Sequence, residues 1–289
     1  MIYSEQALAF ECNREHLVGI LAKPEGESET GVVIVVGGPQ YRAGSHRQFV
    51  LLSRRLAADG IPALRFDYRG MGDSTGEVRS FEEIDDDVAA AIEAICMACP
   101  RIKKIVLWGL CDGASAALTY WSATRDARVA AMVLLNPWVR SAASEAKARI
   151  KYYYARRLLD AEFWTKLVRG RLNVFAALAG FARAAFALRA QPGGPAPYAR
   201  NAFQDRMADG LQAFAGPILL ILSGRDLTAS EFVEYTRSSP RWTALLARSN
   251  LLRREIRGAD HTFSSAQWRE EVETQTIALL RRLAADVRR

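Results

Sequence analysis

A cysteine lies in this sequence at a position where a nucleophile would be exposed. Residues 105–118 read IVLWGLCDGASAAL, which is an apolar strand, the pattern G-x-C-x-G and a helix rich in small residues. Small residues two positions on either side of Cys111 allow the sharp strand-to-helix turn that presents a nucleophile above a sheet. The helix N-terminus favours negative charge on the sulfur and on a nearby oxyanion. Cys111 is therefore the candidate nucleophile, and the alternative is a buried cysteine in an ordinary turn.

A nucleophile at such a turn needs an orienting carboxylate and a base, which follow it along the chain in that order. Residues 217–226 (PILLILSGRD) form an apolar strand that ends in G-x-D, which predicts Asp226 as the acid. Residues 258–263 (GADHTF) place His261, one of only 3 histidines, before the last helix and predict it as the base. Asp260 is the alternative acid, although a carboxylate adjacent in sequence to the imidazole orients it poorly.

The oxyanion of an acyl-transfer reaction needs two backbone N–H donors. One expected donor is the amide of Asp112, the residue after the nucleophile. The other is expected in the loop after the apolar run 32–36, which reads GGPQ at 37–40. The proline of this loop has no N–H, so the donor is Gly38 or Gln40. We favour Gln40 slightly, because the two glycines also suit a tight turn.

Three further residues are candidates for substrate contact. Arg42 and His46 follow the expected oxyanion loop, and Trp138 follows an apolar run at 130–135. His46 fits the start of a helix or a substrate contact better than a second base. Elsewhere, Cys96 and Cys99 form a C-x-x-C, but no second Cys/His pair follows at zinc spacing. We therefore expect neither a metal nor an organic cofactor.

Strand-like and helix-like segments alternate along most of the chain. Helical spacing covers residues 49–59, 81–97, 114–124 and 266–287. The apolar runs that read as strands are 7–11, 17–22, 31–36, 62–66, 104–108, 130–135, 217–222 and 251–256, of which the first two form an antiparallel pair. This alternation predicts an α/β fold with a mostly parallel central sheet and helices on both faces.

The alternation breaks in residues 137–215, which we interpret as a helical lid inserted into a core formed by 1–136 and 216–289. The lid region is basic, whereas the rest of the chain is nearly neutral although the whole chain carries a net charge of +7. Its segment 172–188 (LNVFAALAGFARAAFAL) contains a single charged residue, Arg183. Two interpretations stay open: a helix packed over an acyl pocket, or an interfacial helix that meets anionic lipid.

These motifs together resemble the α/β-hydrolase superfamily. The resemblance rests on the elbow around Cys111, GRD at 224–226, GADH at 258–261 and DYRGMGDS at 67–74, whose Asp and Arg we interpret as a buried salt-bridged turn. Finer motifs are similar to the exosortase-A-system-associated hydrolases of bacteria, namely GGPQYRAGSHRQ at 37–48, GLCDG at 109–113 and NPWVR at 136–140. This resemblance implies an α/β-hydrolase fold and a cytoplasmic hydrolase linked to exopolysaccharide and protein-sorting gene clusters.

The expected reaction is hydrolysis of a carboxylic ester or thioester through a covalent acyl-enzyme on Cys111, with His261 and Asp226 completing a triad. The substrate is a small-molecule or lipid-linked acyl compound. Two other functions stay open. An acyltransferase would form the same acyl-enzyme, and a non-catalytic, membrane-associated adaptor would use the basic lid to bind partners.

Composition and charge narrow the partners. The basic lid region lacks a nucleic-acid-binding motif, so we expect no nucleic-acid partner. The first residues, MIYSE, lack the basic start and apolar run of a signal peptide, which favours the cytoplasm. The lid region suggests peripheral contact with the inner membrane, and the sequence leaves the oligomeric state open.

Overall fold

The computed structural model describes residues 2–38, 40–140 and 202–285. The chain divides into one compact unit, Met1–Val139 with Phe203–Arg289, and a second unit, Arg140–Ala202, which lies almost wholly outside the described residues. The segment 172–188 and its two interpretations therefore lie outside the described residues as well. In the described ranges, no helix is long and apolar enough to cross a bilayer.

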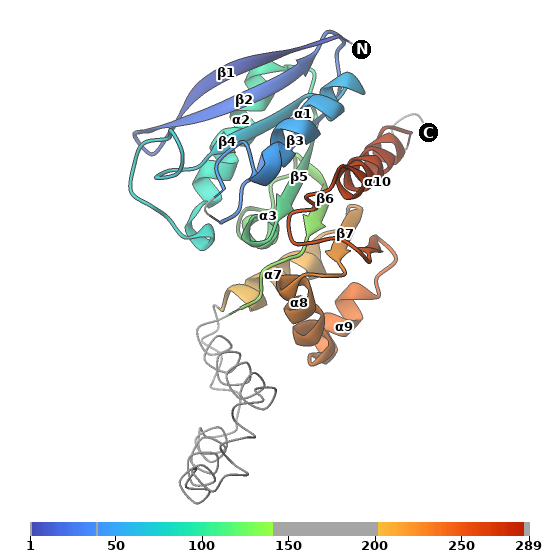
Figure 1. Cartoon of the computed structure of the whole chain (residues 1–289). Coiled ribbons are helices and arrows are strands. Elements are labelled where there is room, and N and C mark those ends of the chain that lie inside the picture. Colours follow the sequence, from blue (N-terminus) through green and yellow to red (C-terminus); the bar gives the residue numbers. More distant parts are fainter. Residues whose placement is uncertain (1, 39, 141–201, 286–289) are drawn as a thin grey trace, which may run out of the picture. The chain divides into compact units, whose positions relative to one another are not determined.

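Eight strands form one sheet in the order β1-β2-β4-β3-β5-β6-β7-β8 (Figure 1). β2 pairs antiparallel with β1 and β4, and all other neighbours are parallel. The strands are β1 (Tyr3–Cys12), β2 (Glu15–Pro24), β3 (Thr30–Val35), β4 (Ala63–Asp67), β5 (Lys104–Leu110), β6 (Val129–Leu135), β7 (Ile218–Ser223) and β8 (Leu251–Ile256). The predicted α/β class with a mostly parallel sheet is confirmed.

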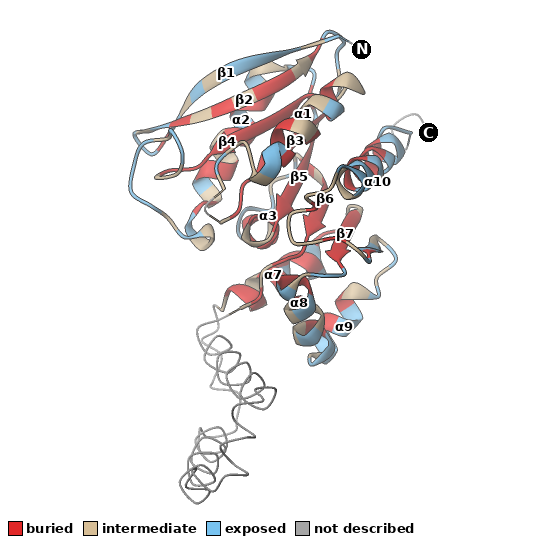
Figure 2. Cartoon of the chain, viewed as in Figure 1, coloured by how far each residue is buried: buried red, intermediate tan, exposed pale blue. Residues whose placement is uncertain are grey.

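Burial explains why the central strands are uninterrupted apolar runs. Every residue of β3, β4 and β7 is buried, as expected where helices cover both faces of a sheet (Figure 2). The two edge strands differ, because β1 and β8 each carry exposed residues along their length. These edges are the places where the strand signal in the sequence is weakest.

Two groups of helices sandwich the sheet. The core on one face includes residues of α1 (Gln48–Ala58) and α10 (Ala266–Ala285). The core on the other face includes residues of α2 (Asp85–Ala98), α3 (Asp112–Thr124), α7 (Phe203–Ala213), α8 (Leu227–Arg237) and α9 (Pro240–Leu246). Short 3₁₀ turns at Ser45–Arg47 and Phe81–Glu83 precede α1 and α2.

One helix of the core lies in the range that the sequence analysis assigned to the lid. α7 packs on α3 and belongs to the same compact unit as the sheet. Met207, Ala208 and Leu211 of α7 are buried in the core shared with α3. The sequence analysis assigned these residues to the lid because the helical composition of residues 137–202 continues through α7.

Candidate active site

The turn between β5 and α3 holds Cys111 in a conformation that non-glycine residues rarely adopt. Its φ is 60° and its ψ is −125°. The Cys111 N–H donates to the carbonyl oxygen of Leu135 (2.9 Å), and the Cys111 carbonyl accepts from the N–H of Trp138 (3.2 Å). The end of β6 therefore holds the strained turn in place from the side.

The glycines of G-x-C-x-G are required by close backbone approach. A Cβ on Gly109 would lie 2.4 Å from the carbonyl oxygen of Gly113. A Cβ on Gly113 would lie 2.3 Å from the carbonyl oxygen of Val35 in β3. Both distances are far below contact distance, so the elbow can pack against the neighbouring strand only with glycine at these positions.

The carboxylate of Asp226 faces the imidazole of His261. Asp226 Oδ2 lies 2.8 Å from His261 Nδ1. Asp226 also caps α8, where its carboxylate accepts from the N–H groups of Thr228 (3.2 Å) and Ala229 (3.0 Å). Burial raises the pKa of Asp226, but the contacts with His261 and the two N–H groups outweigh it and hold this pKa below its usual value. An ionised, fixed carboxylate results.

The alternative acid, Asp260, has other partners. Its carboxylate accepts from the N–H groups of Thr262 (3.2 Å) and Ser264 (3.0 Å), and from the Ser264 hydroxyl. These bonds form a turn that directs Asp260 into its own loop. Asp226 is thus the carboxylate that pairs with His261.

Asn136 is a residue of the site whose role the sequence analysis missed. It follows β6, is fully buried and has a φ of 43°. Its Nδ2 donates to Ser223 Oγ (2.8 Å) and to the His261 carbonyl (3.1 Å), while its Oδ1 accepts from the Ser223 N–H (2.8 Å). Asn136 therefore ties the loops that carry Asp226 and His261 to the strand beside Cys111. A polar residue directly after a buried strand was the available signal.

The expected oxyanion loop lies beside the elbow. The N–H of Gly38 donates to Oδ2 of Asp112 (2.8 Å), so this amide faces the N-terminus of α3. The side chain of Gln40 accepts from Gln48 Nε2 (3.1 Å) and from the N–H of Ser45 (3.4 Å), which fixes it against the start of α1. The Gly38 amide is thus directed to the elbow. The contacts of Gln40 involve its side chain and not its N–H, so the choice between the two donors stays a prediction.

The three residues expected to contact substrate differ in their surroundings. Arg42 forms ion pairs with the buried Asp67 and with Asp73, and its N–H donates to Asp67 Oδ1 (2.6 Å). His46 is exposed and has a φ of 51°. Trp138 is half-buried, and its backbone touches Cys111 directly. Trp138 is thus next to the candidate nucleophile, whereas the Arg42 guanidinium is engaged by carboxylates.

The loop DYRGMGDS is salt-bridged, but its pairs are not formed within the loop. Asp67 pairs with Arg42 of the oxyanion loop. Arg69 pairs with Asp87 of α2, with Arg69 Nη2 2.7 Å from Asp87 Oδ2, and both side chains are buried. The loop 67–74 therefore connects the segment after the oxyanion loop to α2. The sequence analysis expected a salt bridge between Asp67 and Arg69 within the loop and did not predict these partners.

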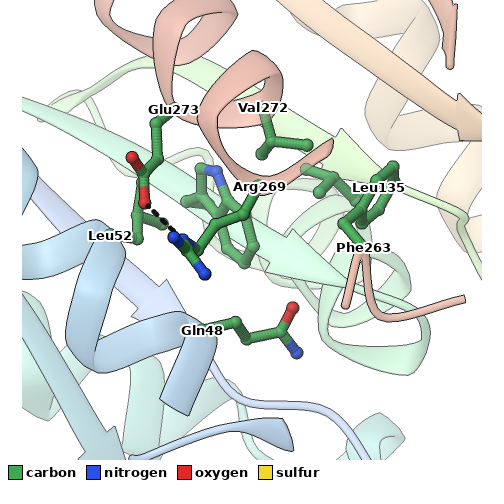
Figure 3. A pocket seen from close by; sticks show the side chains of 8 residues that line it. Gln48, Leu52, Leu135, Phe263, Arg269, Val272 and Glu273 are labelled. Carbon is green, nitrogen blue, oxygen red and sulfur yellow. Dashed lines mark ion pairs between the residues drawn. The ribbon is translucent and has the colours of Figure 1, made fainter. Parts of the chain in front are cut away.

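Figure 3 shows a small cavity lined by Gln48 of α1 and by the pair Arg269–Glu273 of α10. Its volume of about 10 Å³ is that of a single water molecule, too small for an acyl group. The residues that line it are Gln48, Leu52, Trp108, Leu135, Phe263, Arg269, Val272 and Glu273. The cavity is a packing void between α1 and α10.

The fold and the elbow define a family. A family model described as "Alpha/beta hydrolase family" matches residues 32–274, which is most of the chain. The chain therefore belongs to the alpha/beta hydrolase family, as its motifs suggested, and is an enzyme of the hydrolase class. The match begins in β3 and ends in α10, so it includes Cys111, Asp226 and His261.

Solved structures show the same fold at low sequence identity. The Pyrococcus furiosus esterase Pf2001 superimposes with a TM-score of 0.64 at 17% identity, over 97% of this chain and 93% of that one. An alpha-beta serine hydrolase homologue from Coxiella burnetii superimposes with a TM-score of 0.57 at 15% identity, over 95% and 99%. In sequence, the quorum-quenching protein AidA of Acinetobacter baumannii is 30% identical over 135 residues, which is 45% of this chain and 42% of AidA.

Proposed function

We propose that this protein hydrolyses carboxylic esters or thioesters through an acyl-enzyme on Cys111, with His261 as the base and Asp226 as the carboxylate that orients it. The observation that carries the proposal is the strained backbone of Cys111, which follows β5 at the same end of the parallel strands as the Asp226–His261 pair. Strain of this kind persists where surrounding contacts enforce it, and it concentrates at functional sites. Here β6 and the two elbow glycines enforce it.

The reaction proceeds in two balanced halves. His261 takes the proton of the Cys111 thiol, the sulfur bonds to the carbonyl carbon, and the carbonyl π electrons move to the oxygen. When this intermediate collapses, the bond to the leaving group breaks and His261 returns the proton to the departing alcohol or thiol. Water then adds to the acyl-enzyme, giving its proton to His261. The collapse that follows releases the acid and restores the thiol.

A thiol nucleophile narrows the substrate class. The acyl-enzyme on Cys111 is itself a thioester, so its formation from a thioester is nearly balanced in free energy, and its formation from an activated ester or a strained lactone is favourable. Attack on an amide, which must expel an amine, is less favourable for a thiolate nucleophile than for an alkoxide nucleophile. We therefore expect thioesters, activated esters and lactones to be turned over in preference to amides.

The finer expectations from the sequence remain predictions. They are a lipid-linked acyl substrate, a place beside exopolysaccharide and protein-sorting systems, and a cytoplasmic location with peripheral membrane contact. An acyltransferase would use the same acyl-enzyme and pass the acyl group to a sugar or an amine. Product analysis with such acceptors, in competition with water, distinguishes transfer from hydrolysis.

Alkylation of cysteines tests the nucleophile without a known substrate. Iodoacetamide at neutral pH should label Cys111 before the other three cysteines, because the thiolate is the reactive form. Burial raises the pKa of Cys12 to about 11, and it raises the pKa values of Cys96 and Cys99 as well. Peptide mapping after short exposure measures the order, and earlier labelling of Cys96 or Cys99 contradicts the proposal.

Turnover of a thioester and activated-ester panel tests the reaction itself. Cys111→Ala should abolish hydrolysis, while Cys111→Ser should keep part of the ester activity because His261 can also deprotonate a hydroxyl. Cys99→Ala is the matched control, since Cys99 lies at the end of α2 and should leave the rate unchanged. Full activity of Cys111→Ala would refute the assignment.

A further inference from the structure

The side chain of Asp112 has contacts that its predicted role did not include. Its Oδ2 accepts from the Gly38 N–H (2.8 Å), and its Oδ1 accepts from the Gly113 N–H (3.1 Å). Two amides at the elbow thus converge on one carboxylate.

One of these amides is a donor that an oxyanion would need. The N–H after the nucleophile, which is that of Asp112, and an N–H of the loop after β3 form the oxyanion hole of this fold. In this structure the Gly38 N–H of that loop points to a resident anionic group, the side chain of the residue that follows the nucleophile.

The fit between the carboxylate and the loop is close. A Cβ on Gly37 would lie 2.2 Å from Asp112 Oδ1, and Gly38 adopts a φ of 59°. Glycine at both positions lets the loop close over the carboxylate. The GG pair of this loop, which the sequence analysis attributed to a tight turn, thus has a second physical reason.

We propose that the Asp112 carboxylate fills the oxyanion hole of the free enzyme, and that an acyl group reacts at Cys111 only after this carboxylate has turned out of the hole. Asp112 is in this sense a specificity-determining residue of the proposed reaction, on which the inference rests. An oxyanion and a carboxylate cannot share the Gly38 amide, since like charges at contact distance repel strongly.

The surroundings of Asp112 explain why the carboxylate is held but can be displaced. The N-terminus of α3 and the N–H groups of Gly38 and Gly113 favour its charge. Burial opposes that charge and raises the pKa of Asp112 above its usual value, in spite of the amides and of nearby His261. The Tyr68 phenol and the Cys111 thiol are the other titratable groups on adjoining elements. Because burial disfavours the charged carboxylate, it is easier to displace from the amides than a carboxylate that pays no such cost.

The consequence for specificity is a minimum free-energy gain that a substrate must supply before it can react. A substrate must gain enough from binding elsewhere, or be electrophilic enough, to replace the hydrogen bonds of a charged acceptor. This favours thioesters and activated esters over unactivated esters. An oxyanion hole without a resident carboxylate imposes no such threshold.

Comparison of two reagents isolates the oxyanion hole from the thiol. A trifluoromethyl ketone adds to Cys111 and places an oxyanion in the hole: the S–C bond forms and the carbonyl π electrons move to oxygen. Iodoacetamide alkylates the same sulfur by displacing iodide and forms no oxyanion. Binding of the ketone is measured by ¹⁹F NMR, and alkylation by peptide mapping over a range of pH, so that a change in the thiol pKa is seen separately.

Asp112→Asn should bind the ketone about 10- to 100-fold more tightly than the wild type, because a charged hydrogen-bond acceptor no longer competes for the amides. The pH-independent rate of alkylation should change far less. Asp112→Ala removes the acceptor altogether and should also bind the ketone more tightly than the wild type. This second variant controls for an Asn side chain that occupies the oxyanion hole in place of the carboxylate. Asp209→Asn removes an exposed carboxylate of α7 and should leave both reagents unaffected.

Equal or weaker ketone binding in both Asp112 variants, with Cys111 still alkylated, would overturn the role of Asp112 and leave the proposed function intact. Failure of both reagents to modify Cys111 in the folded wild type would overturn the proposed function and this inference together. The two failures are therefore distinguishable.

Discussion

The imidazole of His261 relies on one carboxylate for its orientation. Asp226 lies 2.8 Å from Nδ1, while Asp260 is held by the N–H groups and the hydroxyl of its own turn. Asp226→Asn should lower the rate of acylation by about 10³- to 10⁴-fold, because the uncharged amide neither selects the tautomer nor stabilises the imidazolium. Single-turnover measurement with a thioester gives this rate.

Asp260→Asn is the matched control for that experiment, since it changes a neighbouring carboxylate by the same one atom. It should slow acylation much less than Asp226→Asn. A larger loss in Asp260→Asn would show that the acid has been assigned to the wrong residue.

At the scale of elements, a buried ion pair fastens the loop after β4 to α2. The Asp87 carboxylate is fully buried, and it accepts from the Arg69 N–H (2.8 Å) and from its guanidinium (2.7 Å). Asp87→Ala leaves the Arg69 charge buried without its partner and should lower the free energy of unfolding by about 3–5 kcal/mol. Urea denaturation measures the loss.

The neighbouring Asp86 provides the comparison for this pair. Its side chain is 67% exposed and lies 3.7 Å from Arg69. Asp86→Ala should therefore cost at most about 1 kcal/mol. Equal losses in the two variants would mean that burial of the Asp87 pair is not what holds the loop.

At the scale of the whole molecule, the described residues on either side of 141–201 contact each other. Gln204 Nε2 donates to the Val139 carbonyl (3.1 Å), so the chain ends on either side of that segment are adjacent. Replacing 141–201 by a short Gly-Ser linker should leave a chain that unfolds cooperatively, with a melting temperature within about 5 °C of the wild type. Calorimetry tests this, and an uncooperative transition would contradict it.

The same two chains address the predicted membrane contact. The full chain should co-sediment with anionic vesicles at low salt and less so with neutral ones, whereas the linker chain should stay in the supernatant. Equal sedimentation of both chains would show that the membrane contact is made by the core and not by residues 141–201.

Much of the fold follows from local patterns in the sequence. All eight predicted strand segments overlap the eight strands of the sheet. The elbow was also predictable, because its strand, turn and helix follow one another in a single segment and Gly109 is required within the turn itself, although Gly113 also makes room for Val35 of β3. Short-range sterics and apolar runs act between neighbours in the chain, so sequence alone expresses them. The helices α8 and α9 were missed, since their weak apolar spacing merged with the loops around them.

The partners of the charged residues were decided by tertiary structure. The sequence predicted Asp226 as the partner of His261 with Asp260 as the alternative, and the tertiary contacts of the two carboxylates, at the start of α8 and in the turn at Asp260, separate them. The same holds for Asn136, whose buried bonds reach residues 87 and 125 positions away. The contact between Gly38 and the Asp112 carboxylate joins residues 74 positions apart. Such pairings depend on how the parallel strands from β3 to β8 align in the sheet, and no spacing along the chain encodes that alignment.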